Sequence, residues 1–478
     1  MISRKQQLLA RHRRGKRIAL VLALILLLAV ASLDWRLAFP LLLLGWITHE
    51  AWFSDHLFYN PRADYDYRFD AAVETLPARL ENGCLRIQGE YGVYAADDTL
   101  LLAIRLESGG WGRLRPPAVD IETAETRDCQ TFEFGASGLR YLNLTGLAAA
   151  LAAGEIRLRG RRCAIGRELR LLRVRHPDYR QQRLLIIAPH ADDAELAAFG
   201  LYSQAREVWI VTLTAGEIEA ENYQGLGLSA VEAARLKGRL RAWDSRAVPL
   251  WGGVPADRCV SLGYFCMQLA AMRKNPETAF ASRVADLDDT RPLRQGNALP
   301  LPGDADGAPT WKNLLADLAA LIERVRPEAI VLPHPDFDPH PDHIAAYAAV
   351  RESLTHTDWR PQALLCYANH LHDNDAWPMG EAHTGVPLPP RFAKSPTPRS
   401  PWALPLTAAE QIDKACALAM MHDLQLPLPL KRRLRRALQT LLAGRRWPPY
   451  GANEYFRKAV RKQEVFWVER NHRRRHSP

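Results

Sequence analysis

A short apolar run that ends in a cluster of metal-type ligands constrains this chain most. The side chains of 184–188 are all apolar, as expected for a buried strand, and His190, Asp192, Asp193 and Glu195 follow directly. In an open α/β sheet the active site lies just outside the carboxyl ends of the strands. The run therefore predicts an α/β fold in which this loop contributes to a site.

A second apolar run repeats the arrangement. Residues 329–332 are followed by HPDFDPHPDH, which ends in His340, Asp342 and His343. One imidazole and one carboxylate from the first loop, with one imidazole from the second, would make a three-ligand zinc site. Such a site keeps a coordination position open for water, which is typical of a catalytic zinc rather than a structural one.

Strand and helix patterns alternate from residue 183 onward. They predict a catalytic domain of the α/β class with a Rossmann-like, mostly parallel sheet. The predicted strands are 184–188, 208–213, 248–251, 329–332 and 363–367, and the predicted helices are near 194–204, 229–246, 311–325, 344–354, 407–421 and 429–443. The long irregular segment 252–306 is predicted to be functional, because long loops in compact α/β domains usually are.

The chain is long enough for more than one domain. We predict a basic N-terminus with membrane segments at 1–50, a β-rich accessory domain at 66–178 and the catalytic domain at 183–465. Short strand-like runs separated by Gly, Asn and Asp predict that the accessory domain is a sandwich. Such modules can bind glycans, but a spacer or packing role is the simpler expectation.

The N-terminal region has the pattern of a membrane anchor. Residues 18–33 are uncharged and apolar, 34–36 (Asp-Trp-Arg) interrupt, and a second apolar run covers 37–47. One long tilted helix would place the catalytic domain outside, whereas a hairpin would return the chain to the cytoplasm. The basic N-terminus favours an inside start, and we predict the hairpin, with the catalytic domain on the cytoplasmic side of a bacterial inner membrane.

Charge is concentrated in two patches. The net charge is +10, but residues 1–17 and 431–446 each hold seven Lys or Arg. Basic patches beside apolar segments suggest anionic lipid, although 431–446 could equally be a solvated surface helix. A nucleic-acid-binding surface would spread over a folded face, so no nucleic-acid partner is predicted. No protein partner can be inferred, and the seven cysteines form no CxxC pair and suggest no disulfide framework.

The order of ligands suggests roles for the individual residues. Neighbouring residues in an extended loop point in opposite directions, so one of Asp192 and Asp193 can bind metal while the other faces a bound water. Likewise, one of His340 and His343 can bind metal while the other faces the substrate. Asp342 could hold His340 in its protonated form, ready to stabilise an oxyanion. Alternatively, Asp192 and Asp342 could simply cap helices.

These motifs resemble the PIG-L/LmbE-like family of zinc-dependent de-N-acetylases. Its first motif is similar to residues 189–195 and its H-P-D-H motif to residues 340–343. Segments 214–217 (Thr-Ala-Gly-Glu) and 262–264 (Leu-Gly-Tyr) are also similar to family segments. The resemblance covers roughly 183–370 and leaves out the membrane and β-rich parts.

The resemblance implies a role for each candidate residue. His190, Asp193 and His343 would bind Zn²⁺, Asp192 would be the general base, and His340 would be the electrostatic and acid group with Asp342 behind it. The implied enzyme is a metal-dependent N-deacetylase. It would remove the acetyl group from an N-acetylglucosamine-containing glycoconjugate, such as lipopolysaccharide core or another envelope or lipid-linked glycan. The alternative is a membrane-tethered glycan-binding protein with a non-catalytic metal site.

Overall fold

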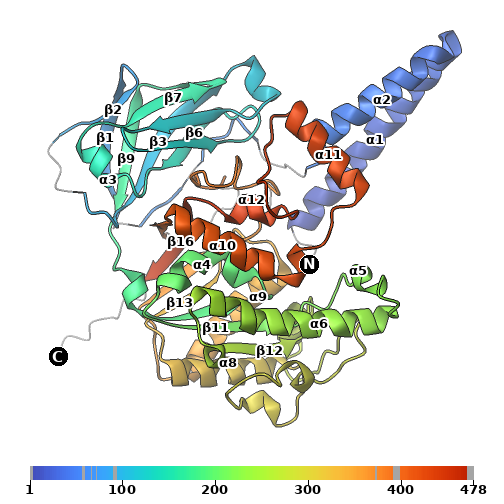
Figure 1. The fold of residues 1–478 in the computed structure, drawn as a ribbon, viewed down its shortest axis with the longest axis vertical. Coiled ribbons are helices and arrows are strands. Elements are labelled where there is room, and N and C mark those ends of the chain that lie inside the picture. Colours follow the sequence, from blue (N-terminus) through green and yellow to red (C-terminus); the bar gives the residue numbers. More distant parts are fainter. Residues whose placement is uncertain are drawn as a thin grey trace.

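The computed structural model describes residues 4–55, 60–65, 67–70, 73–89, 94–371, 374–390 and 399–470. The described residues build a helical hairpin, an antiparallel sheet and a mixed α/β layer structure (Figure 1).

The N-terminal region folds into two helices that lie side by side and project from the rest of the chain (Figure 1). They are α1 (Arg4–Leu33) and α2 (Trp35–Trp52). The break falls at Asp34, whose side chain accepts a hydrogen bond from the Arg36 backbone N–H and so caps α2. Residues 7–33 are long and apolar enough to cross a membrane, by length and composition only. The helical return after Asp34 is the shape that the hairpin alternative requires.

The first sheet is antiparallel throughout its described pairings. Its strands are β1 (Val73–Glu81), β2 (Cys84–Ile87), β3 (Thr99–Ser108), β4 (Ala118–Glu122), β5 (Arg127–Thr131), β6 (Gly138–Asn143), β7 (Arg157–Arg161), β8 (Cys163–Ile165) and β9 (Glu168–Val174), with helix α3 (Ala148–Ala152).

This sheet curls until it nearly closes. Strand β7 pairs with β2 and β4, and β8, which follows it, pairs with β3 on the other side of the sheet. Apolar side chains such as Leu102 and Ile121 fill the interior. The region is β-rich, as predicted, but it is one barrel-like sheet and not a sandwich. Turn signals mark strand ends and do not tell whether the strands form one curled sheet or two stacked ones.

The second sheet has the strand order β12-β11-β10-β13-β14-β16-β15. These strands are β10 (Arg183–Ala188), β11 (Glu207–Thr214), β12 (Cys259–Tyr264), β13 (Ala329–Pro333), β14 (Ala363–Tyr367), β15 (Ser400–Pro405) and β16 (Gln463–Arg470). The helices around it are α4 (Asp193–Gln204), α5 (Glu221–Gln224), α6 (Ala230–Ala247), α7 (Leu269–Lys274), α8 (Trp311–Val325), α9 (Pro341–Ser353), α10 (Ala408–Met420), α11 (Leu430–Leu441) and α12 (Tyr455–Ala459).

The prediction of a Rossmann-like, mostly parallel sheet is wrong. The second sheet is mixed, since β16 pairs antiparallel with both β14 and β15, and the larger first sheet is antiparallel. An apolar pattern identifies a strand but carries no information on its direction, and β15 was not among the predicted strands. The strands that matter for the site, β10 and β13, do run parallel.

Both faces of the second sheet are buried, as a run of apolar residues without alternation predicts. Along β10, Leu184 and Ile186 join one core cluster with residues of α4 and α10, and Leu185 and Ile187 join the other with α8 and α9. The predicted helix 311–325 is confirmed by α8. The predicted strand 248–251 is wrong, since 248–252 form a 3₁₀ helix; Pro249 provides no backbone N–H for a sheet.

A buried ion pair fixes β16 against the helical layer. Lys414 of α10 lies 2.7 Å from Glu464 of β16, and both side chains are almost fully buried. The same carboxylate accepts the backbone N–H groups of Gly200 and Leu201 in α4. The pair therefore joins α4, α10 and β16.

We expect Lys414→Met to lower the free energy of unfolding by about 3–5 kcal/mol, because the Glu464 carboxylate would stay buried without its cation. Chemical denaturation of the full chain measures this. Lys312→Met is the matched control, since Lys312 pairs with Glu277 on the surface and should matter little. Equal stability of the two variants would mean that the buried pair has no special structural role.

Candidate active site

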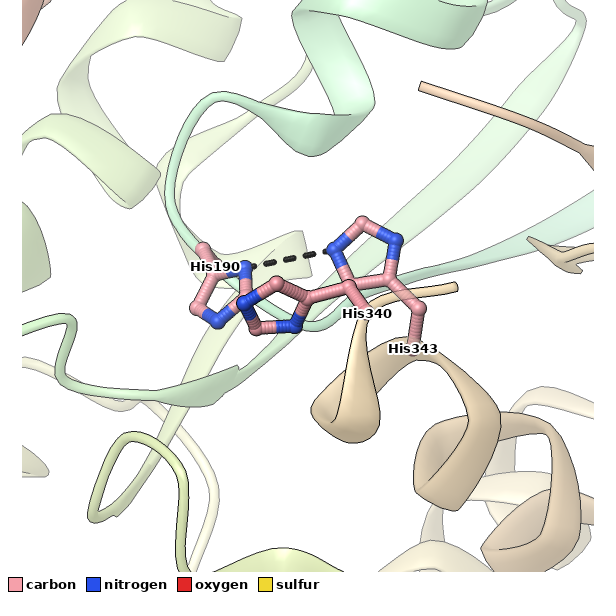
Figure 2. A group of neighbouring side chains, drawn as sticks. All are labelled: His190, His340 and His343. Atoms are coloured by element: carbon pink, nitrogen blue, oxygen red, sulfur yellow. Dashed lines mark hydrogen bonds between the residues drawn. The ribbon is translucent and has the colours of Figure 1, made fainter. Parts of the chain in front are cut away.

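The two ligand-rich loops meet at one edge of the second sheet. His190 and Asp193 follow β10, and His340 and His343 follow β13; the two strands pair in parallel, so their carboxyl ends lie together. Figure 2 shows the three imidazoles turned toward one another, and each offers a ligand atom within 4.8 Å of the others. The two clusters therefore lie together at this edge of the sheet.

Three donor atoms form a small triangle. Oδ2 of Asp193 lies 3.1 Å from Nδ1 of His190 and 3.2 Å from Nε2 of His343, and these two nitrogens are 3.3 Å apart. Zinc bonds of about 2.0–2.2 Å in a tetrahedron place neighbouring donor atoms roughly 3.3–3.6 Å apart. The spacing of this triangle is close to that of one face of such a tetrahedron.

A carboxylate stands behind each of the two imidazoles. Oδ2 of Asp342 lies 3.3 Å from Nε2 of His190, and Oδ2 of Asp338 lies 2.9 Å from Nδ1 of His343. Each carboxylate therefore binds the ring nitrogen that faces away from the triangle. This arrangement leaves the lone pair of the inner nitrogen for a metal, and it is the usual surrounding of zinc-bound histidines.

The electrostatics also favour a positive charge at the triangle. Burial lowers the pKa of His343, but the negative charges of Asp193 and Asp338 outweigh it and raise the pKa to about 10. Burial opposes the charge of Asp193, yet the pKa of this carboxyl is held well below its usual value by His343 and His190. The donor set, its spacing and its charge all fit a divalent cation such as zinc.

Asp192 lies beside the triangle without belonging to it. Its backbone has φ 114°, an uncommon value that turns the chain between β10 and α4. One carboxylate oxygen lies 3.3 Å from Nη2 of Arg241. Burial raises the pKa of Asp192 to about 6, against the lowering effect of the Arg241 charge. A carboxylate with this pKa can both accept and release a proton near neutral pH.

His340 lies across the site from His190, with ring centroids 4.8 Å apart. Its Nδ1 accepts the backbone N–H of Asp342 at 3.3 Å, so a neutral His340 carries its proton on Nε2. Burial and the charges of His190 and His343 lower its pKa to about 3. The Asp342 carboxylate bonds to His190 and to the Met267 backbone N–H, and no hydrogen bond joins it to the His340 ring among the described contacts.

Several residues of the site were not singled out from the sequence. Asp338 is fully buried and also accepts the backbone N–H groups of Asn369 and His370. The Asn369 side chain donates to Oδ1 of Asp193 at 2.8 Å, and His370 stacks on His340. Asn369 and His370 directly follow β14, the next strand along the sheet. The rule that placed the first two loops would have found this third one.

Glu195 and the segments 214–217 and 252–306 contact neighbouring parts of the chain. Glu195 turns into the core, where the Tyr202 hydroxyl donates to it at 3.2 Å. Glu217 accepts the Cys266 backbone N–H at 3.2 Å and the Ser282 hydroxyl at 2.8 Å, and so ties the 214–217 segment to the 252–306 segment. Cys266 and Met267, from that same segment, reach the Asp342 carboxylate.

Asp338 gives a test of the carboxylate behind His343. We expect Asp338→Asn to weaken zinc binding by about 10–100-fold, because the amide cannot hold the His343 ring as strongly in the required tautomer. Zinc titration against a competing chelator measures the change, with the exposed Asp257→Asn as the matched control. Unchanged affinity would remove Asp338 from the site.

The chain is similar to known proteins in one region. Residues 185–354 match the family model of PIG-L, described as GlcNAc-PI de-N-acetylase. No curated protein matches the chain.

Solved structures match this chain with low sequence identity and low TM-scores. The A40926 pseudoaglycone deacetylase Dbv21 is 18% identical over 60% of this chain and 97% of its own, with a TM-score of 0.32. The zinc-inhibited form of teicoplanin deacetylase Orf2 is 16% identical over 61% of this chain and 99% of its own, with a TM-score of 0.31. The 4-carboxy-2-hydroxymuconate hydratase GalB from Pseudomonas putida KT2440 is 14% identical over 54% of this chain and 84% of its own, also with a TM-score of 0.31. At these scores the solved structures carry no argument, and the similarity to the PIG-L family rests on residues 185–354, which match its family model.

Proposed function

We propose that this chain is a metal-dependent N-deacetylase that hydrolyses the acetamide of an N-acetylglucosamine-containing glycoconjugate. The single observation that carries the proposal is the triangle of His190, Asp193 and His343, with a carboxylate behind each imidazole and Asp192 beside it. The family match supports the reaction class. An envelope or lipid-linked glycan, such as lipopolysaccharide core, is the proposed source of the sugar.

The chemistry divides among few residues. When bound, zinc supplies a Lewis acid that polarises the acetyl carbonyl and lowers the pKa of a water molecule. Asp192 takes the proton of the attacking water, for which a pKa of about 6 suits it. The Nε2–H of neutral His340 can donate a hydrogen bond to the oxyanion that forms. As the C–N bond breaks, Asp192 returns its proton to the departing amine and acetate is left.

Arg241 positions the proposed base. Its guanidinium lies 3.3 Å from the Asp192 carboxylate and also forms an ion pair with Asp423. It donates a hydrogen bond to the Ala191 backbone carbonyl at 2.5 Å. These contacts keep the carboxylate of Asp192 from turning into the triangle of donor atoms. Asp193 therefore remains the ligand and Asp192 the base in this proposal.

The substrate can be tested in cells that make the protein. Glycan fractions from cells with and without it should differ by the mass of one acetyl group on an amino sugar. Cells that carry Asp192→Asn should give the same masses as cells without the protein. Identical glycan masses in all three would contradict a role in envelope glycan de-N-acetylation.

We further propose that the hairpin of α1 and α2 enters a membrane and returns, which leaves the catalytic region cytoplasmic. The observations behind this are the basic N-terminus, the break at Asp34 and the side-by-side helices (Figure 1). A reporter that is active only in the cytoplasm should be active when fused to the C-terminus. A signal only from a periplasm-specific reporter would contradict the topology.

A further inference from the structure

A large cavity lies away from the histidine cluster. It has a volume of about 550 Å³ and lies between the first sheet, the 376–384 segment and the chain that follows α11. None of the proposed ligands or catalytic residues lines it. Its walls are rich in arginine, and they contain Arg115, Arg161, Arg162, Arg445, Arg446 and Arg457. The one acidic side chain in the described lining is Glu381.

Carboxylates offset only part of this charge. Four of the arginines have a carboxylate partner, and the pairs are Arg161 with Asp120, Arg445 with Asp55, Arg446 with Glu381 and Arg457 with Glu454. Two of these pairs, those of Arg161 and Arg446, are 3.4 Å long and join well-exposed arginines. Such pairs are weak in water and leave the guanidinium able to bind another anion.

The other two arginines are held by carbonyl groups. Arg115 donates to the backbone oxygens of Leu441 at 3.1 Å and Leu442 at 3.3 Å, and Arg162 donates twice to that of Pro116. A carbonyl positions a guanidinium but does not neutralise it. Burial and the positive charge of Arg161, with a further contribution from Arg115, lower the pKa of Arg162. Like charges are thus crowded at one wall of the cavity, which an anion would relieve.

We propose that this cavity binds a phosphorylated ligand, with Arg115, Arg161, Arg162 and Arg446 around its phosphate. The guanidinium group matches phosphate oxygens with paired N–H donors, and several guanidiniums suit a group that carries more than one negative charge. The volume is that of a site for a small organic molecule. The proposal is independent of the deacetylase activity, because it uses other residues.

The place of the cavity indicates where the phosphate could come from. The end of α11 and the residues after it form part of its wall. Arg435 of that helix pairs with Glu50 near the end of α2 at 2.5 Å. The Trp52 indole donates to the backbone oxygen of Leu114, next to Arg115, at 2.7 Å. The cavity therefore adjoins the base of the helical hairpin. A lipid headgroup and a soluble phosphate compound share the required chemistry.

The test uses the purified full chain in a nonionic detergent and isothermal titration with inorganic phosphate. We expect one binding site, and binding weaker by about tenfold or more in the double variant Arg115→Gln, Arg161→Gln, the effect of losing hydrogen bonds to a charged group. Arg324→Gln, an exposed arginine on α8, is the matched control and should bind as the unchanged protein does. Thermal unfolding without phosphate checks that the double variant is folded. If it is not, Arg446→Gln alone, whose side chain is 72% exposed, should still weaken binding.

A second titration distinguishes the sources. Dihexanoylphosphatidic acid should compete with inorganic phosphate. Competition at concentrations well below those needed with glycerol phosphate would assign the site to a lipid headgroup, and equal concentrations would assign it to a soluble phosphate compound. Either result supports the proposal. The absence of phosphate binding, or binding that survives the arginine substitutions unchanged, would overturn it.

Discussion

Replacement of His343 by alanine should leave the protein with almost no bound zinc and no deacetylase activity. His343 lies 3.2 Å from Asp193 and 3.3 Å from His190, and its side chain is fully buried. Alanine would remove one of three donors and leave the Asp338 carboxylate buried without its partner. Metal analysis of the purified variant measures the loss directly.

The matched control for this variant is His356→Ala. His356 is exposed and lies just beyond α9, the helix on which His343 stands. The control should retain about one zinc per chain, as expected for a single three-ligand site. A His343→Ala protein that is folded and retains full zinc would remove His343 from the metal site, and with it the ligand set proposed here.

Asp192→Asn should lose activity, as His343→Ala does, but should retain its zinc. The asparagine side chain has nearly the same shape and can still accept from Arg241, so the loop should keep its structure. It cannot take a proton from water, and loss of a general base usually costs about 10²–10⁴-fold in turnover. Acetate release and zinc content are measured on the same preparation.

Asp193→Asn is the variant to compare with Asp192→Asn, because it separates the role of a metal ligand from that of a base. Asp193 is the neighbouring carboxylate, with an oxygen close to both His190 and His343, so this variant should lose zinc as well as activity. The two variants would then both lose activity, but only Asp193→Asn would lose zinc. Near-normal turnover by Asp192→Asn would rule out its role as the base.

The site could be predicted from the sequence because its ligands are local to two strand ends. An apolar run followed by His190 and Asp193, and a second followed by His343, brings these residues together whenever the two strands are parallel neighbours, as β10 and β13 are. Partners fixed by packing were harder to foresee. Arg241 reaches Asp192 from the middle of α6, which no spacing along the sequence indicates.

The pairing of carboxylates with imidazoles was the least predictable part. The motif order suggested that Asp342 stands behind His340, two residues earlier. The cap at the start of α9 instead bonds His340 to the backbone of Asp342, and the Asp342 side chain is left to bind His190 from the other loop. Strand direction could not be predicted either. The alternating pattern predicted parallel strands, but β16 pairs antiparallel with both β14 and β15.

The most direct test of the deacetylase proposal is acetate release from an N-acetylglucosamine conjugate by the purified full chain. The chelator-treated protein should be inactive, one equivalent of zinc per chain should restore activity, and Asp192→Asn loaded with the same zinc should stay at least about a hundredfold slower. Zinc-loaded protein that binds the conjugate but releases no acetate would contradict the enzyme and favour a glycan-binding protein.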